Sequence, residues 1–363
     1  MGKKATLLLT RILLQAFTVC VALLTVAGWS AGFISPDHSQ LITFMGLGLT
    51  LILMVDLILF VGWIFAKSLW ALVPLAVILL NIGQITSIIN IDLRQGDDLP
   101  AKDFTIATYN IHGYVHHDFN KTLTNIAQYM NEEKVNILCM QEFIDQRDQV
   151  TDSVLNMIYP YHIVKSEYRS MQLAVFSKYP ILNSQIIQFR ESANCAMWAD
   201  IDIEGQKIRI FNIHLQTTNL NQSHTEIDKV KNLSIEDPES QRAINIIMAR
   251  LDQNTIKRSE QVRQIHSEID KCPKDRAVIV CGDFNDPPSS YTYHQLVHEL
   301  IDGFKSAGSG YAYTFKPMYH LFRLDYIFHS PLLQGIKYSS PNVSWSDHNP
   351  VLLDFAFNRP IAI

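Results

Sequence analysis

The sequence predicts a mixed α/β fold of the α+β kind, a sandwich flanked by helices and preceded by three transmembrane helices. Two observations support this prediction. Three long apolar segments fill the first 92 residues, and from residue 104 onward short β-rich runs alternate with helical stretches. Some runs follow one another as hairpins and others are separated by helical crossovers, which is typical of sheets packed against helices.

The three apolar segments lie at about residues 5–33, 41–66 and 69–91. Each supplies the roughly 20 apolar residues that cross a bilayer core. The first segment also fits a cleaved signal peptide, because basic residues precede its apolar core. We favour a retained helix, since the apolar run is longer than a signal core and two further segments follow.

The short loops predict the orientation of these segments. Basic residues near the chain start are Lys3, Lys4 and Arg11. The loop at 35–40 has no Lys or Arg, and Lys67 lies at the next turn. The positive-inside rule then places the N-terminus in the cytoplasm. Three crossings would give an integral membrane protein, in the bilayer through residues 5–91, with its main domain on the extracytoplasmic (periplasmic or extracellular) side.

Asp56 lies within the second apolar segment. A carboxylate at that depth is a functional candidate by default. No second charge lies in the same segment to pair with it, so a role in helix packing is an equally good interpretation.

Composition divides the chain into a membrane section at 1–92, a linker at 93–103 and a folded domain at 104–363. The linker is charged and contains Gly96 and Pro100. Residues 1–100 hold five of the 30 Lys and Arg and five of the 35 Asp and Glu, which leaves 25 basic and 30 acidic residues for the rest. The domain is therefore slightly acidic.

The domain contains eight predicted strands and four predicted helices. The strands are at 104–111, 135–143, 173–181, 196–205, 207–215, 277–284, 324–330 and 351–357. The helices are at 118–132, 149–157, 238–270 and 289–300. The strands at 196–205 and 207–215 form a hairpin, because a turn with Gly205 separates them.

The five cysteines show no CxxC spacing and no metal-finger pattern. We expect buried free thiols, and a disulfide such as Cys195–Cys272 remains open.

Polar residues recur at the ends of the predicted strands. They are Asn110, Glu142, His214, Asp283 with Asn285, Asp325, and the pair Asp347-His348. Each one alone has a structural explanation, since Asn and Asp form turns and a lone His is usually a core residue. Recurrence at six strand edges is not explained in this way, because strand ends present polar groups to a shared cleft.

The chemistry of this set is consistent with phosphoester hydrolysis. Carboxylate and amide oxygens suit Mg²⁺ or Mn²⁺. A carboxylate beside a histidine fixes its tautomer and raises its basicity. Phosphoester hydrolysis needs a metal ion, an oriented water and donors around the phosphoryl oxygens.

An ordered series of motifs carries a family resemblance. The motifs are "TYNIHG", "CMQEF", "YRSMQLAVFSKYPI", "FNIHLQ", "RSEQ", "CGDFNDPP", "LDYIFHS" and "SDHNPV". Over 103–358 the chain resembles the endonuclease/exonuclease/phosphatase (DNase I-like) superfamily, which includes DNase I, abasic-site endonucleases, neutral sphingomyelinases and inositol polyphosphate 5-phosphatases. The resemblance implies a four-layer sandwich of two packed β-sheets flanked by helices.

The resemblance also implies a role for each matched residue. Glu142 would be the principal ligand of Mg²⁺ (or Mn²⁺), and Asn110 a second ligand or a phosphate-orienting amide. Asp283 would orient or deprotonate the attacking water. Asn285 and His214 would contact the phosphate. Asp347 would contribute to the metal site or to His348. His348 would act as general base or stabilise the phosphoryl oxygens, and Asp325 would support it.

Two departures from the family pattern concern the surroundings of the site. The family usually has Gly where this chain has Gln172. The insertion at 219–256 is long and charged, which favours a surface insertion over a lid on the cleft. Tyr168 precedes the strand at 173–181 where the family often places a phosphate-facing Tyr, but we assign it no role.

Two substrate classes follow from these features. The first is a lipid headgroup or another phosphoester near the membrane, because a short linker would keep the cleft close to the bilayer. The alternative is DNA or RNA, cut by an extracytoplasmic nuclease. Nucleic-acid binders normally present a basic face, and the acidic balance of this domain weighs against tight binding of that kind. A non-enzymatic, decayed domain is disfavoured because every matched polar position is retained. No protein partner is inferred.

Overall fold

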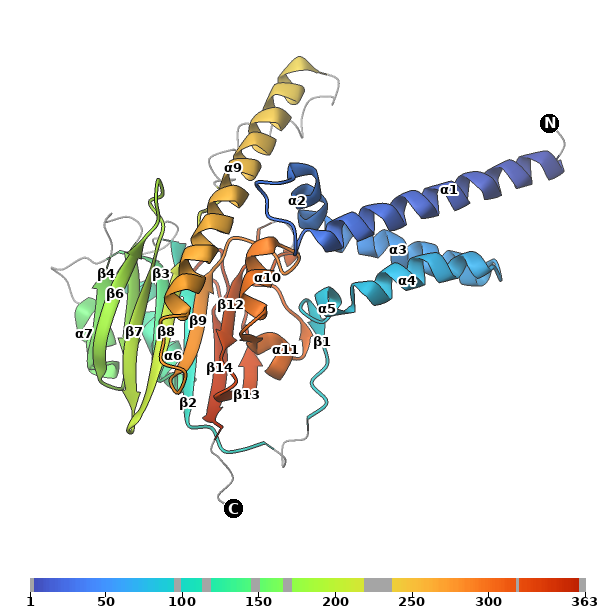
Figure 1. The fold of residues 1–363 in the computed structure, drawn as a ribbon. Coiled ribbons are helices and arrows are strands. Elements are labelled where there is room, and N and C mark those ends of the chain that lie inside the picture. The colour runs from blue at the N-terminus through green and yellow to red at the C-terminus, as the bar shows by residue number, and fades with distance from the viewer. Residues whose placement is uncertain are drawn as a thin grey trace. The chain divides into compact units, whose positions relative to one another are not determined.

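The computed structural model describes residues 3–94, 99–112, 119–144, 151–165, 172–218, 237–317 and 320–358. The chain divides into two compact units (Figure 1). One unit consists of Met1–Thr86 with Pro287–His294, and the other of Ser87–Asp286 with Gln295–Ile363. The predicted linker at 93–103 stays a prediction.

The first unit is built from helices. They are α1 (Lys3–Ser30), α2 (Gln40–Leu47), α3 (Leu49–Phe65), the short 3₁₀ helix η1 (Leu69–Ala71), α4 (Leu72–Leu80) and α5 (Ile82–Ile85). The prediction of three transmembrane helices is wrong. Among the described helices only α1, over Lys4–Ser30, is long and apolar enough to cross a membrane in one piece.

The other two predicted spans fail for different reasons. The second breaks at Gly48, where α2 and α3 meet at 64°, so it counts as one span only if the bent pair is taken together. The third, Leu69–Leu80, is shorter. At 1.5 Å per residue it reaches about 18 Å, against a bilayer core of about 30 Å.

Asp56 is fully buried within the first unit. It accepts a hydrogen bond from the hydroxyl of Thr25 on α1. A second polar contact joins the same two helices, because the Trp63 indole nitrogen donates to Thr18 Oγ1 at 2.9 Å. Both contacts favour the helix-packing interpretation of Asp56.

The second unit contains two six-stranded sheets. The first sheet has the order β10 (Ile301–Asp302), β12 (Asp325–His329), β9 (Ala277–Asp283), β8 (Gln206–His214), β7 (Cys195–Ile203) and β6 (Ile181–Gln188). The second has the order β13 (Leu333–Ser339), β14 (Val351–Phe357), β2 (Phe104–Asn110), β3 (Ile137–Phe143), β5 (Gln172–Ser177) and β4 (Tyr161–Lys165). A short pair, β1 (Ile89–Asn90) with β11 (Gly310–Tyr311), completes the strands described.

Alternation along the strands explains the layering. In β2, Phe104 and Ile106 enter the core shared with the first sheet, whereas Ala107 and Tyr109 pack on the opposite side. That opposite side is covered by α6 (Phe119–Glu132) and α7 (Thr151–Ile158). The prediction of two packed sheets flanked by helices is confirmed.

Three further helices follow in the chain. They are α9 (Pro238–Ile269), α10 (Tyr291–Val297) and α11 (Gly303–Ala307). Of these, α10 begins in the segment Pro287–His294 of the first unit. The long helix α9 adjoins β8, because the Gln216 backbone N–H, just past that strand, donates to Gln261 Oε1 at 2.8 Å (Figure 1).

Some predicted elements differ from the structure. The run at 173–181 is not one strand, since β5 ends at Ser177 and β6 begins at Ile181. Strands β1, β4, β10, β11 and β13 were not predicted, nor was β6 beyond its first residue. All five cysteines are free thiols, which answers the open question of a Cys195–Cys272 disulfide, but Cys20 is exposed and not buried as expected.

Strand register brings the polar strand ends together. Parallel pairing of β8 with β9 sets His214 opposite Asp283, and antiparallel pairing of β12 with β9 sets Asp325 opposite the same residue. In the other sheet, parallel β2 and β3 set Asn110 opposite Gln141, next to Glu142. One edge of the sandwich therefore collects side chains from five strands.

Candidate active site

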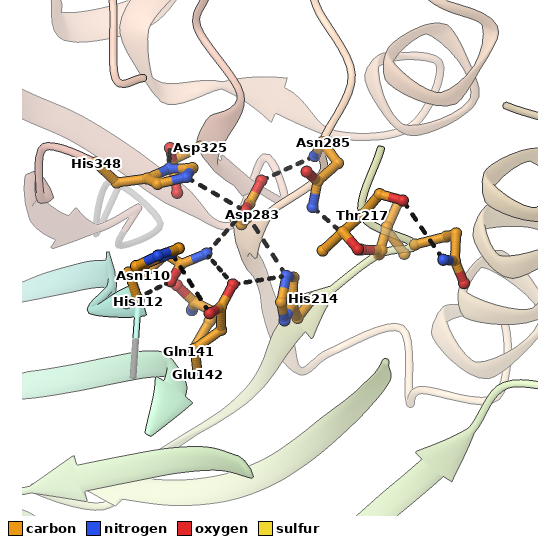
Figure 2. A network of polar contacts seen from close by, with 12 residues as sticks. Asn110, His112, Gln141, Glu142, His214, Thr217, Asp283, Asn285, Asp325 and His348 are labelled. Atoms are coloured by element: carbon orange, nitrogen blue, oxygen red, sulfur yellow. Dashed lines mark hydrogen bonds and ion pairs between the residues drawn. The ribbon is translucent and has the colours of Figure 1, made fainter. Parts of the chain in front are cut away.

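The predicted residues meet at this edge in one network of polar contacts, and Figure 2 labels all of them except Asp347. The network includes Asn110, Glu142, His214, Asp283, Asn285, Asp325, Asp347 and His348. Eight residues far apart in sequence thus share one site. The roles that the resemblance implies for them stay predictions, but their proximity is a property of the fold.

Glu142 occupies an unusual backbone conformation. Its φ is +53°, and the register of β3 against β5 shifts between Met140 and Phe143. A bulge of this kind turns a side chain away from the regular alternation of a strand. Asn285 has the same left-handed φ of +53°. Sparsely populated conformations cluster at functional sites, where the surrounding structure holds them.

Asn110 links the two sheets. Its Nδ2 donates to Asp283 Oδ2 at 2.9 Å and to Glu142 Oε1 at 3.1 Å. Its Oδ1 accepts the backbone N–H of His112 at 2.9 Å. The amide nitrogen therefore faces the carboxylates, which fits an orienting role better than ligation through the oxygen.

His348 lies between two buried carboxylates. Its Nδ1 is 2.8 Å from Asp325 Oδ2, and its Nε2 is 3.8 Å from Asp283 Oδ2. Burial alone would lower the pKa of His348, but the negative charges of Asp325 and Asp283 outweigh it and raise the pKa to about 10. Burial also raises the pKa of Asp283, against the opposing effect of the His348 charge. The imidazole is thus protonated at neutral pH.

His214 lies on the other side of Asp283. Its Nε2 is 3.6 Å from Glu142 Oε1 and 3.8 Å from Asp283 Oδ2. The side chain is 1% exposed, and within the described part of the chain neither ring nitrogen has a hydrogen-bond partner. Buried polar atoms in this state need an explanation, such as a catalytic role or a bound water or ion.

Asn285 and Asp347 are positioned by their own loops. The Asn285 backbone N–H donates to Asp283 Oδ1 at 2.8 Å, and its Nδ2 donates to Leu215 O at 3.1 Å. Ser346, which precedes Asp347, donates from its hydroxyl to Asn110 O at 2.8 Å and so fixes the final loop against β2.

The donor chemistry of the site fits a divalent cation. Glu142 and Asp347 are 16% and 17% exposed, so both carboxylates are reachable from solvent. Asp283, Asp325 and His348 bring their ligand atoms within 4.8 Å of one another. In that group the Asp325–His348 hydrogen bond already explains the arrangement.

Sequence reasoning missed several residues of this site. His112 followed a predicted strand end but received no role, although its Nδ1 is 3.6 Å from Asp347 Oδ1 and 3.8 Å from Glu142 Oε2. Gln141 was also missed. Its Nε2 donates to Asn212 Oδ1 at 2.7 Å, which joins the two sheets beneath the site. The only available signal was a polar side chain inside an otherwise apolar strand.

Two features from the sequence cannot be placed. Tyr168 and residues 219–236 of the insertion lie outside the described residues. Gln172 begins β5, so the strand forms without the glycine that is usual in the family.

Comparison with known proteins identifies the fold. The solved structure of the human Nocturnin catalytic domain with bound sulfate is 19% identical, with a TM-score of 0.52 over 70% of this chain and 93% of that chain. An endonuclease/exonuclease/phosphatase from Bacteroides vulgatus is 18% identical, with a TM-score of 0.52 over 70% and 99%. The Bacteroides thetaiotaomicron mannosyl-6-phosphatase is 16% identical, with a TM-score of 0.50 over 70% and 100%.

Family models match both parts of the chain. Residues 10–88 match a domain of unknown function (DUF8431). No curated protein matches the chain. A model described as the endonuclease/exonuclease/phosphatase family matches residues 107–348, which is more than half of the chain. Together with the two-sheet sandwich, this match shows that the chain belongs to the endonuclease/exonuclease/phosphatase family.

Proposed function

We propose that this protein is a divalent-metal-dependent phosphoester hydrolase, of the phosphodiesterase type, that acts near a membrane to which α1 anchors it. One observation carries the proposal. Carboxylate, imidazole and amide groups from both sheets meet at one edge of the sandwich, around Glu142 and Asp283. Members of the family are hydrolases of phosphoesters.

The chain's own residues divide the work of hydrolysis. His348 holds a proton on Nε2, facing the interior of the site, while Asp325 accepts from Nδ1 and fixes the ring. A protonated imidazole in this position would stabilise phosphoryl oxygens, as the second of its two predicted roles requires. Asp283, whose pKa burial raises, would orient the attacking water and accept its proton.

Asn110 would keep Asp283 and Glu142 at a fixed separation by donating to both. His214 and Asn285 border Asp283, so they support phosphate binding from that side. Glu142 would hold the ion with Asp347 nearby. When bound, Mg²⁺ or Mn²⁺ would neutralise charge that develops on the phosphoryl oxygens and lower the pKa of a coordinated water.

The substrate stays open between two classes. A phosphoester at the membrane, such as a lipid headgroup, is favoured by the apolar helix α1 and by the excess of acidic over basic residues in 101–363. A nuclease is the alternative, and a basic binding face would be expected for it.

A substrate panel with the full-length chain in detergent tests this function. Phospholipid and sphingolipid vesicles, plasmid DNA and bis-p-nitrophenyl phosphate would each be supplied with Mg²⁺ or Mn²⁺. We expect diesterase activity that chelation of the metal abolishes. DNA cleavage that is lost in His348→Ala would instead establish the nuclease.

The variant Glu142→Gln tests the metal assignment separately from the other proposed roles. Removing one carboxylate charge while keeping the side-chain shape should lower the rate by about 10²–10³, as loss of one electrostatic stabiliser typically does. The control is Glu191→Gln, an exposed glutamate that also has a left-handed φ, of +53°. Unchanged activity in Glu142→Gln would show that the metal assignment is wrong.

A further inference from the structure

His112 lies on the open side of the candidate active site, two residues beyond the end of β2. Its φ is +48°, and its backbone N–H donates to Asn110 Oδ1 at 2.9 Å. Asn and His tolerate the left-handed conformation better than most residues. The turn at 110–112 therefore directs the imidazole toward Glu142 (Figure 2), and Asp347 lies at a similar distance.

The ring stands between two carboxylates from different parts of the chain. Its Nδ1 is 3.6 Å from Asp347 Oδ1 and 3.8 Å from Glu142 Oε2. Direct hydrogen bonds between charged groups of this kind measure about 2.7–2.9 Å, so both separations are wider. Cis ligands of an ion at about 2.1 Å lie about 3.0 Å apart, so shared ligation would bring the imidazole nitrogen closer to each carboxylate by about 0.6–0.8 Å.

His112, Glu142 and Asp347 are more exposed than the residues in the interior of the site. His112 is 24% exposed, close to the values for Glu142 and Asp347, whereas Asp283 and Asp325 are almost fully buried. An ion entering from solvent would meet the imidazole and the two carboxylates first.

The orientation of Asn110 reinforces the argument. Its amide oxygen accepts from the His112 backbone, and its amide nitrogen faces Glu142. An oxygen ligand expected at this position is therefore turned aside, and the His112 nitrogen is a donor that lies within 4 Å of both Glu142 and Asp347. Imidazole suits first-row transition ions, whereas Mg²⁺ prefers oxygen ligands.

The geometry points to His112 as a third ligand of the metal ion, with Glu142 and Asp347. This inference rests on the proposed metal-dependent function and deepens it. A site with one nitrogen and two carboxylate ligands selects a first-row transition ion over Mg²⁺. Mn²⁺ is the probe for this class.

Isothermal titration of the full-length chain in detergent with MnCl₂ and with MgCl₂ tests the inference. We expect the wild-type protein to bind Mn²⁺ more tightly than Mg²⁺. His112→Asn retains a residue that tolerates the left-handed φ and replaces the nitrogen ligand by an amide. It should weaken Mn²⁺ binding by about ten-fold or more, a loss within the range that even outer-shell partners of a metal produce.

Mg²⁺ binding should weaken less in the same variant, so the ratio of the two dissociation constants should fall. His112→Gly also accepts the positive φ and removes the ligand altogether, so it should show the same loss for Mn²⁺. His162→Asn changes an exposed histidine on β4, outside the site, and should leave both constants unchanged.

The outcomes separate this inference from the function on which it rests. If His112→Asn and His112→Gly leave the ratio unchanged while Glu142→Gln abolishes binding, His112 is not a ligand and the proposed metal site stands. If the wild-type chain binds neither ion, the proposed metal dependence fails and the role of His112 fails with it.

Discussion

His348 shows how neighbouring charges decide the state of a single residue. Burial disfavours its charged form, yet Asp325 and Asp283 raise its pKa from 6.5 to about 10. The imidazolium should therefore persist across neutral pH, and only at alkaline pH should the proton leave. The raised pKa of His348 is a local effect, because it depends on two side chains within 4 Å of the ring.

The pH dependence of kcat/KM should reflect this shift. A rate that needs protonated His348 falls as the pH rises toward about 10. A rate that needs ionised Asp283 falls as the pH drops, and this acid limb lies above the ordinary carboxyl pKa of 3.8. Asp325→Asn removes a charge that raises the pKa of His348, so the alkaline limb should move to lower pH.

Rates on bis-p-nitrophenyl phosphate between pH 4 and pH 11 (about the range in which both groups titrate) check this expectation. The control is Asp354→Asn, a part-buried aspartate on β14 whose carboxylate faces Lys102 and Thr105 away from the site. A wild-type alkaline limb near the ordinary histidine value, unchanged in Asp325→Asn, would contradict the protonated state.

At this scale the sequence predicted which residues meet but not how each is oriented. The motifs "GDFN" and "SDH" identified Asp283, Asn285, Asp347 and His348, because the chemistry of these side chains can be recognised without knowing where the fold places them. The left-handed backbone at His112 and Glu142 was not predictable, since neither residue type requires it. The turn of Asn110 toward both carboxylates depends on contacts across two sheets.

Among the elements, β9 shows why one residue type is required within a strand. Gly282 has φ +137°, and a Cβ built there would lie 1.9 Å from the carbonyl oxygen of Ile213. Its register partner on β8 is that same residue, one position before His214 faces Asp283. The absence of a side chain at Gly282 lets the two strands approach where they carry their functional groups.

Gly282→Ala should therefore destabilise the fold and disturb the site together. Backbone strain alone costs about 1–3 kcal/mol, and the clash with Ile213 adds to it. The thermal midpoint should fall by about 2–4 °C for each kcal/mol in a domain of this size. Thermal unfolding of the full-length chain in detergent measures the change.

Gly205→Ala is the matched control. Gly205 has φ +91° in the β7–β8 turn, and no heavy atom lies within 4 Å of its built Cβ. That variant carries the strain without the clash. Equal losses in thermal midpoint for the two variants would show that the close approach of β8 and β9 does not matter.

The helices and strands that were predicted best are those with the clearest local sequence pattern. The hairpin of β7 and β8 was predicted nearly to the residue, because apolar residues alternate and Gly205 marks the turn. Strand β13 (LQGIKYS) was missed because it mixes polar and apolar residues and packs at a sheet edge. The break between Ser177 and Ile181 was missed because the run at 173–181 resembles a single continuous strand despite Lys178–Pro180.

For the whole molecule, the sequence predicted the two-sheet domain correctly and the number of membrane helices wrongly. Hydropathy measures apolar length, and the second segment contains enough of it. It does not register the bend at Gly48 or the short length of Leu69–Leu80, which depend on backbone geometry. Only α1 among the described helices is therefore a candidate for a single unbroken crossing.

We propose that α1 crosses the membrane once with its N-terminus in the cytoplasm, because Lys3, Lys4 and Arg11 lie at that end and loops rich in Lys and Arg stay inside. One crossing puts the rest of the chain outside. In a bacterial host, an alkaline phosphatase fused after Ile363 should then be active, whereas a cytoplasmic reporter at the same position should not.

An epitope before Met1 distinguishes an anchor from a signal sequence. We expect it to stay on the same polypeptide as the C-terminal reporter and to sediment with membranes, since cleavage would separate the two. Changing Lys3, Lys4 and Arg11 together to Gln should reduce the active fraction of the phosphatase fusion by weakening the orientation signal. An inactive phosphatase with an active cytoplasmic reporter would mean that α2 and α3 complete a second crossing, and the substrate would then have to be a cytoplasmic phosphoester.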